Sequence, residues 1–575
     1  MPFPRGELLL RRGMAALLSA VGAQQALAVI HEPTSTAEQR AAAGAYVEEL
    51  KNNPEAALAC SAQLIAPELP PTVRHFGLSL IHAVIERQWH QPGFEARQAE
   101  VKALILQMMA SDTGRPLTEE PRYIKEKLAG LLSAVGCREW PQRWPDMFEQ
   151  LFQIAAMGHR QAELAIIALR LVGEEIMEFN DSLDGGRRSD LSQALKVSLP
   201  QVLPFINEFA KTRFEALGVA RAQGAAASAD VKALIQLLDV ALQLLQSMCQ
   251  WVPLQLLYIN EFVPLCCALV GDPDTRVRSC ECIFLLAQRP IDRMGKPSKM
   301  EEEVTTAQIE HAKLQLRTLV ALLAATPLGT VESLLENEGA YRFAKRVSQL
   351  VAAIGEQQAS IFDPPGGYQG RKDLLASKPP GAELDGALTA YLTLALATAS
   401  HPSASVAVSP LRALRALLRN DAVRAREPFA KVLPSLVNLL LAKLPRIYDP
   451  AFLRPDDRSV PAEEHVCAQF SELDFDEEDG FRAFYGVFRA ASSQLIQEVT
   501  KVEPLMAMAA AQQIAKALVD GGALGCCGLE AVGVAPQLAQ VRDFVLKTMN
   551  FAAKTMDFVL KMMDLHKHRM RRTRR

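Results

Sequence analysis

The sequence predicts an all-α protein built as a solenoid of helical repeats. Apolar residues recur with helical spacing from about residue 14 onward, and capping signals stand at the expected helix starts. No run alternates between apolar and polar residues in a way that indicates a strand. Paired helices of ~12–20 residues that recur about every ~40–50 residues are typical of HEAT-type repeats. We therefore expect an α-solenoid of HEAT-type helical repeats.

Capping signals mark the first helices, which follow an N-terminal extension expected at residues 1–13. Ser35-x-x-Glu38 has the form of a capping box and predicts a helix to about residue 51. Asn53-Pro54 predicts an N-cap followed by proline at the first helical position. Pro71 is expected to open the next helix.

Two apolar stripes predict buried helices further along the chain. The first stripe consists of Ile124, Leu128, Leu131, Leu132 and Val135. The second consists of Val231, Leu234, Ile235, Leu238, Leu242 and Leu245, with Leu237, Val240 and Leu244 on its other side. The second helix should therefore be buried all round. Asp272-Pro273 predicts the cap of a later helix that ends near Gln288.

A tryptophan–proline corner separates two of these helices. Trp140 precedes Pro141 and Trp144 precedes Pro145, and a residue before proline is pushed out of the α region. The first helix should end at Trp140, and the next should begin with Pro145 at its first position and Asp146 near its N-terminus. We predict that both indoles are buried and structural.

Three stretches are expected to interrupt the helices. Residues 217–230 are rich in alanine and glycine, and residues 363–382 contain two proline–glycine clusters that predict a long loop. Residues 444–472 combine four prolines with charges and form the longest expected insertion. In solenoids such insertions project from one face, which is often the binding face.

The composition indicates an intracellular chain without a membrane span. The 575 residues are 49% hydrophobic and carry a formal charge of −3, so any binding of nucleic acid needs a local basic face. The ten cysteines contain no C-x-x-C pattern and lie mostly in apolar runs, which suits reduced, buried thiols. No apolar run in the sequence reaches the ~18 residues that a helix needs to span a membrane.

No catalytic or metal-binding motif is present in the sequence. H-E-x-x-H, G-x-S-x-G and G-x-G-x-x-G patterns are absent, and Gly295-Lys296 lacks the earlier glycine of a phosphate-binding loop. We predict that the chain is not an enzyme and holds no metal or cofactor of its own.

Two charged segments are candidate binding sites. Arg412, Arg415 and Arg419 share one side of an expected helix, with Arg424 and Arg426 close behind. Guanidinium groups in a row can contact phosphates of an A-form duplex by shape, and the alternative is a solvated helix face. A compact acidic loop contains Asp474, Asp476, Glu477, Glu478 and Asp479. That loop could meet a basic partner, repel RNA or favour a helix N-terminus.

The amino-acid sequence of the tryptophan–proline corner resembles that of a known family. REWPQRWPDM at residues 138–147, with the YIK sequence at residues 123–125, resembles the exportins of the importin-β superfamily and is most similar to the exportin-5 family. WV at 251–252, EC at 281–282 and LDFD at 473–476 resemble later parts of that family. The similarity runs from about residue 15 to about 520, and we expect the sequence to represent an N-terminal half of a longer chain.

VRHFGL at residues 73–78, continuing to Trp89, resembles the first repeats of the importin-β superfamily, which reach toward the GTPase Ran. The resemblance makes Arg74, His75, His82, Arg87 and Trp89 candidates for Ran contact. The acidic loop residues Asp474, Asp476, Glu477, Glu478 and Asp479 are further candidates.

The resemblance implies a nuclear export receptor. Such a receptor binds Ran-GTP together with cargo, crosses the pore through weak contacts with FG nucleoporins and shuttles between nucleus and cytoplasm. The implied cargo is double-stranded RNA such as microRNA precursors, with tRNA or RNA-binding proteins as further cargo. GTP is carried by Ran and not by this chain, which we expect to be a monomer. The alternatives are a HEAT-repeat scaffold without transport activity and an import receptor of the same superfamily.

These expectations divide the chain into seven segments. They are an extension at 1–13, Ran-binding repeats at 14–110, exportin-like repeats at 111–290, further repeats at 291–443 with the loop at 363–382, an insertion at 444–479, helices at 480–520, and a divergent helical region with a basic tail at 521–575.

Overall fold

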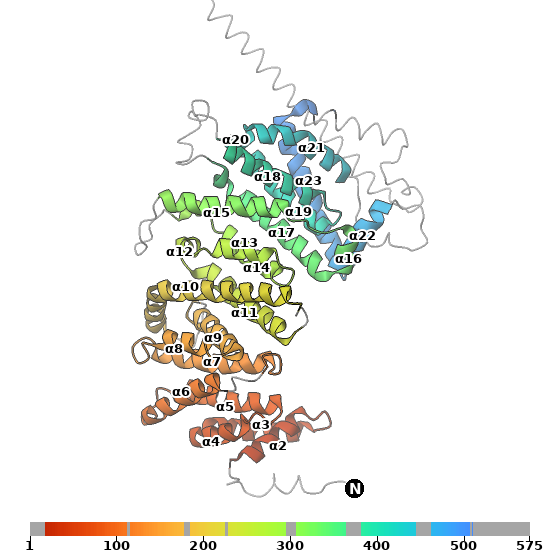
Figure 1. Ribbon diagram of the computed structural model, residues 1–575. Coiled ribbons are helices and arrows are strands. Elements are labelled where there is room, and N and C mark those ends of the chain that lie inside the picture. Colours follow the sequence, from red (N-terminus) through yellow and green to blue (C-terminus); the bar gives the residue numbers. More distant parts are fainter. Residues whose placement is uncertain are drawn as a thin grey trace, which may run out of the picture. The chain divides into compact units, whose positions relative to one another are not determined.

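The computed structural model describes residues 18–111, 116–177, 184–224, 228–294, 306–363, 381–443, 462–506 and 509. All the regular elements in these ranges are helices, and none of these residues lies in a strand (Figure 1). The all-α prediction is confirmed. The chain divides into two compact units, one that ends at Val252 and one that begins at Pro253.

The first unit stacks helices in two layers. Its helices are α2 (Ala20–His31), α3 (Ala37–Asn52), α4 (Pro54–Leu64), α5 (Pro71–Gln88), α6 (Glu95–Ala110), α7 (Arg122–Glu139), α8 (Met147–Ala155), α9 (His159–Met177), α10 (Gly185–Ala222) and α11 (Ala229–Trp251). In one layer α5, α7, α9 and α11 each pack on the next, and α4, α6, α8 and α10 pair with them from the other side. This is the arrangement of HEAT-type repeats that the sequence predicts.

The second unit repeats the two-layer pattern. Its elements are α12 (Leu254–Ile259), α13 (Phe262–Val270), α14 (Arg276–Ala287), η1 (Ile291–Arg293), α15 (Thr306–Ala325), α16 (Val331–Glu336), α17 (Glu338–Gln357), η2 (Ala359–Phe362), α18 (Ala382–Ser400), α19 (Ala404–Leu418), α20 (Asp421–Arg424), α21 (Glu427–Lys443), α22 (Ala462–Asp474) and α23 (Glu478–Val502). One layer contains α14, α17, α19 and α23, and the other contains α13, α15, α18 and α21.

The apolar stripes predicted from the sequence are buried as expected. All five stripe residues of α7 are buried, and so are the α11 stripe residues on both sides except the half-buried Ile235. By length and composition α11 could cross a membrane, which the sequence analysis did not anticipate. Because 61% of its most apolar window is buried and the helix lies against α9 and α10, its apolarity is that of a core helix.

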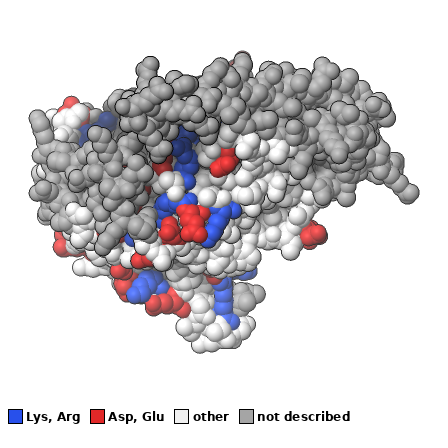
Figure 2. Space-filling model, turned by 90° about the horizontal axis from the view of Figure 1, so that it is seen from above, with Lys and Arg blue, Asp and Glu red and all other residues white. Residues whose placement is uncertain are grey.

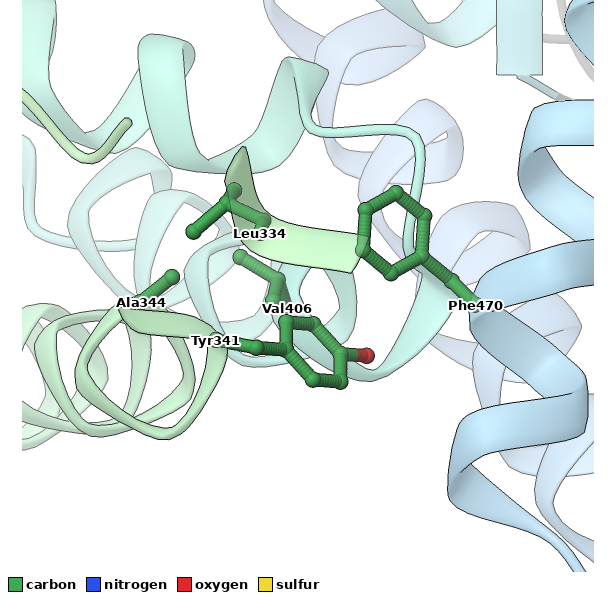
Figure 3. Close-up of a cluster of buried hydrophobic side chains, with 5 residues drawn as sticks. All are labelled: Leu334, Tyr341, Ala344, Val406 and Phe470. Atoms are coloured by element: carbon green, nitrogen blue, oxygen red, sulfur yellow. The ribbon is translucent and has the colours of Figure 1, made fainter. Parts of the chain in front are cut away.

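In the second unit, α22 packs against α16, α17 and α19 through a cluster of buried hydrophobic side chains. Phe470 points from α22 toward Leu334 and Tyr341, and Val406 of α19 completes the cluster (Figure 3). The Tyr341 hydroxyl donates to Asp474 Oδ2 at 2.7 Å, at the end of α22. The prediction of an insertion at residues 444–472 is therefore partly wrong, because α22 begins at Ala462. Residues 444–461 lie outside the described ranges.

The tryptophan–proline corner is buried as predicted. α7 ends at Glu139, Trp140 follows in an extended conformation, and the peptide bond between Trp140 and Pro141 is cis. Trp140 is 2% exposed and Trp144 3% exposed. Arg187 of α10 donates hydrogen bonds to the Cys137 and Trp140 carbonyl oxygens, which ties the corner to the next repeat.

Several helix starts differ from the sequence prediction by a few residues. The capping box of α3 uses Thr36 and Gln39 in place of Ser35 and Glu38, since either pair has the required spacing. α8 begins at Met147 with Asp146 as its N-cap, so Pro145 precedes the helix instead of opening it. α14 begins only at Arg276, because the Asp272 carboxylate accepts from the Asp274 amide at 2.9 Å and closes a local turn.

The predicted cap and proline starts near the N-terminus are confirmed. The Asn53 side chain accepts from the Ala56 amide with Pro54 in the first turn, and α5 opens at Pro71. The interruption expected at 217–230 is shorter than predicted, because α10 continues to Ala222 through residues with high helix propensity. Residues 1–17, 364–380 and 510–575 lie outside the described ranges. These ranges include the predicted N-terminal extension, most of the predicted loop at 363–382 and the predicted C-terminal region with its basic tail.

We expect Trp144→Ala to destabilise the protein strongly, because the indole is almost fully buried and donates to Gln150 Oε1 at 3.3 Å. Removing a buried tryptophan costs about 3–5 kcal/mol in free energy of unfolding. Thermal unfolding of the variant checks this, with Val197→Ala as the control because Val197 is 72% exposed. An unchanged melting temperature in Trp144→Ala would contradict the structural role of the corner.

Candidate functional site

Two of the five Ran-contact candidates on the first repeats lie inside the protein. Trp89 is 1% exposed and packs against Phe94 with ring centroids 6.1 Å apart. The Arg74 side chain is 12% exposed and binds Glu120 Oε1 at 2.5 Å. Trp89 cannot contact a partner directly in this conformation, and the Arg74 guanidinium is largely buried in its ion pair with Glu120. The sequence could not separate them from the exposed residues of the same segment.

Arg74 belongs to a buried ionic cluster that joins successive repeats. Glu120, just before α7, is held by Arg74 of α5 and by Arg160 of α9, whose Nη2 lies 3.0 Å from Glu120 Oε2. Arg160 also donates to the Ser111 carbonyl oxygen at 3.1 Å. Burial alone would raise the pKa of Glu120, but Arg160 and Arg74 lower it below its ordinary value.

A second buried ion pair lies one turn further along the same layer. Lys125 of α7 and Glu163 of α9 are each 1% exposed, and their charged atoms are 2.7 Å apart. Lys125 also donates to the Leu117 carbonyl oxygen, and Gln236 of α11 donates to Glu163 Oε1 at 2.8 Å. These hydrogen bonds and the ion pair join α7, α9 and α11. They could not be predicted, because no sequence pattern distinguishes a buried lysine from an exposed one.

The remaining candidates on α5 lie on an open face beside α7. His75 contacts the ring of Tyr123 edge to face, with centroids 5.6 Å apart, and Tyr123 is 44% exposed. His82 Nδ1 lies 3.5 Å from the Glu86 carboxylate, and Arg87 binds Glu48 and Asn52 of α3. Burial and the charge of Lys127 lower the pKa of both histidines, which favours neutral imidazoles.

The acidic Ran-contact candidates likewise include one residue with a buried side chain and several exposed residues. Asp474 is 6% exposed and is held by the Tyr341 hydroxyl and by Lys345 Nζ at 2.9 Å, so its carboxylate is a structural anchor for α22. The other four acids, Asp476, Glu477, Glu478 and Asp479, are exposed at the start of α23. Glu478 pairs with Arg482 one turn away at 2.5 Å.

The five candidate RNA-binding arginines are not equivalent. Arg426 is 7% exposed and binds Asp385 and the Phe362 carbonyl oxygen, so it secures the start of α21 and is unsuited to RNA. Arg424 pairs with Asp421 at 2.6 Å, and Arg415 donates to Gln494 of α23 at 2.6 Å. Arg412 is 55% exposed and lies 3.3 Å from Glu356, while Arg419 is exposed at the end of α19.

The described surface shows no continuous field of one charge in the view of Figure 2. Lysine and arginine lie beside aspartate and glutamate on this face. Of the exposed arginines of α19, Arg412 lies 3.3 Å from the Glu356 carboxylate, so its charge is partly balanced within the protein. Any phosphate contact there has to be local.

Metal binding and thiol chemistry find no support in the described part of the chain. There, no group of three or more histidine, cysteine, aspartate or glutamate residues could hold a metal ion. The described cysteines are free, and all but Cys267 are buried. Burial raises the pKa of the Cys267 thiol to about 11 and of the Cys137 thiol to about 12, which keeps both protonated and unreactive at neutral pH.

Comparison with known families finds two successive matches. Residues 121–283 match the family described as Exportin 1-like protein, and residues 338–552 match the Exportin-5 family. Exportin-5 from Dictyostelium discoideum is 23% identical over 488 residues, which is 83% of this chain and 38% of the relative. Exportin-5 from Mus musculus is 24% identical over 518 residues, which is 88% of this chain and 39% of the relative.

The chain thus spans under two fifths of the length of these relatives. Among solved structures, the karyopherin Kap121p bound to the SUMO protease Ulp1p matches with a TM-score of 0.40 and 11% identity. That match covers 95% of this chain and 51% of the other.

We expect Glu120→Gln to destabilise the protein by about 3–5 kcal/mol at neutral pH, because it leaves two buried arginines without their carboxylate. The folded-state pKa of Glu120 is lowered from 4.5, so its stabilisation is full above pH 4.5 and is lost as pH falls through the folded-state value. Chemical unfolding of both proteins across this range checks the prediction. A stability difference that stayed constant down to low pH would contradict it.

Proposed function

The chain belongs to the exportin-5 family, and on that premise we propose that it acts as a nuclear export receptor that binds Ran-GTP and cargo together. The observation that carries the proposal is that the two family matches fall on both compact units. Members of this family are karyopherins, which are transport receptors and not enzymes. The receptor shuttles between nucleus and cytoplasm, and its only nucleotide is the GTP held by Ran.

The proposed Ran-binding surface is the open face of α5 and α7 in the first unit. His75, His82 and Arg87 remain candidates there, whereas Arg74 and Trp89 support the face from within. The exposed acids 476–479 in the second unit are a separate candidate contact. A switchable receptor needs different affinity for the two nucleotide states of its partner, because only differential binding shifts an equilibrium.

The proposed cargo is double-stranded RNA such as microRNA precursors, with tRNA or RNA-binding proteins as further candidates. Arg412 and Arg419 are the exposed members of the arginine row, two turns apart on α19. Guanidinium groups at that spacing suit backbone phosphates, because the deep groove of an A-form duplex hides its base edges. Arg415 and Arg424 are partly committed to protein contacts and would contribute less.

Contact with FG nucleoporins would use apolar surface on the opposite layer of the first unit. Phe152 of α8 stacks on Phe205 of α10 with centroids 4.1 Å apart, and both rings are half-buried. Pro204 and Val197 are exposed on the same helix, α10. A shallow apolar surface of this kind suits weak, rapidly exchanging contacts with phenylalanine side chains.

We expect the chain to bind Ran-GTP at least about tenfold more tightly than Ran-GDP, which corresponds to about 1.4 kcal/mol. Pull-down and titration with Ran locked in each state measure the ratio. Equal affinity for the two states would leave a scaffold without transport activity as the better interpretation. The double variant His75→Ala/His82→Ala should weaken Ran-GTP binding, and exposed Lys196→Met on α10 serves as the control.

We expect Arg412→Gln/Arg419→Gln to weaken binding of every duplex RNA sequence alike, because phosphate contacts do not read bases. Each lost phosphate contact should lower the slope of log affinity against log salt by about one unit. The matched control is Lys431→Gln, since Lys431 is 72% exposed on α21. Unchanged duplex affinity in the double variant, or a loss confined to some sequences, would contradict the proposed contact.

A further inference from the structure

The helix α22 stands outside the two layers of the second unit. α23, which follows α22 in the chain, packs directly on α19 of its own layer and on α21 of the other layer (Figure 1). The layered stack therefore passes from α21 to α23 without α22. Because the repeat pattern does not require this helix, α22 can leave its place without opening the stack.

α22 contacts the stack through one apolar side. Its anchor is Phe470, which is fully buried and packs against the Tyr341 ring with centroids 5.0 Å apart. Cys467, one turn earlier, is also buried, whereas the neighbouring Gln469 is exposed. The helix covers a surface, here called the α22-binding surface, that is formed by Leu334, Tyr341, Ala344 and Val406 (Figure 3). This is how an amphipathic helix binds an apolar surface of a partner.

A carboxylate gives this contact a second point of recognition. Asp474 lies four residues after Phe470 and so on the same side of the helix. Its Oδ2 accepts from the Tyr341 hydroxyl at 2.7 Å, and its Oδ1 accepts from Lys345 Nζ at 2.9 Å. The Tyr341 hydroxyl also lies 2.8 Å from Ser403 Oγ. The surface thus recognises an aromatic ring that is followed four positions later by a carboxylate.

One polar group beside Phe470 is left unsatisfied by α22. The His401 ring, 9% exposed, lies against Phe470 with centroids 5.2 Å apart, and its Nδ1 accepts from the Ser403 amide at 3.0 Å. Burial and the charge of Lys443 lower the pKa of His401 to about 4, so the neutral ring carries its proton on Nε2. Across the described ranges, this buried Nε2 has no hydrogen-bond partner. A buried donor without an acceptor costs free energy, which a helix that offers an acceptor would recover.

We propose that the α22-binding surface is a docking site for a helix of a partner protein, and that α22 occupies it as an exchangeable internal ligand. The partner helix carries an aromatic residue, a carboxylate four residues later and a hydrogen-bond acceptor that reaches His401 Nε2. Because α22 is tethered to the surface, it rebinds at a high effective concentration. The partner helix therefore has to match the surface better than α22 does.

The first arm of the test is hydrogen exchange of the parent chain under native conditions. The amides of α22 should exchange on the order of 100-fold faster than those of α17 and α19, because α22 opens locally while the stack stays closed. Phe470→Ala should speed exchange in α22 and leave α19 unchanged. Gln469→Ala is the matched control on the exposed side and should leave both unchanged. Exchange of α22 at the rate of α19 would show a helix integral to the unit and overturn the proposal.

The second arm offers the surface a helix in trans. The probe is a synthetic peptide of residues 462–474 with Cys467→Ala, titrated against the parent chain and the Phe470→Ala chain. It should bind the variant at least about tenfold more tightly than the parent, because the internal competitor is weakened. The same peptide with Asp474→Asn should bind at least about tenfold more weakly, because it loses the charge that Lys345 contacts.

Two results of the second arm would overturn the proposal. One is equal binding of the peptide to both chains, or no binding to a Phe470→Ala chain whose α19 amides remain protected. The other is dimerisation of the parent chain that rises with concentration and is lost in Phe470→Ala, which would assign the surface to α22 of a second copy.

Discussion

Mutual burial between neighbouring helix pairs is the constraint on which both units depend. A single pair cannot cover its own apolar faces, so each must present them to the next repeat. The consequence is visible in α9, which is buried on several sides because it lies between α7 and α11 of its own layer and against α8 and α10 of the opposite layer. Stability is therefore shared along the chain, and the surface left for partners is the outer side of each layer.

Close stacking also determines what charged residues do. Arg74, Glu120 and Arg160 meet between repeats, and Lys125 meets Glu163 in the same layer, so these ions hold adjacent helices in register. Arg426 and Asp474 have similar roles in the second unit. A charge that the fold already satisfies has little left to offer a partner. The candidates that remain are those whose side chains are exposed, such as Arg87, Arg412 and Arg419.

The fold could be predicted from the sequence because helical periodicity and proline position are local signals. Asn53-Pro54, Pro71 and Trp140-Pro141 gave helix boundaries within a residue. The one-residue error at Thr36 arose because two overlapping pairs had equal capping spacing, and the error at Asp272 arose because its side chain prefers a turn. Site residues were harder, because burial of Trp89 or Arg426 depends on helices distant in the sequence.

We propose that this chain is an export receptor, in which Ran-GTP and cargo support each other's binding. The most direct measurement is the affinity for a duplex RNA with a short 3′ overhang, with and without saturating Ran-GTP. An export receptor predicts positive coupling of about 1–3 kcal/mol, seen as roughly 5–150-fold tighter RNA binding when Ran-GTP is present. RNA affinity that is unchanged by Ran-GTP would indicate a scaffold, and weaker RNA binding would indicate an import receptor; either result would contradict the account.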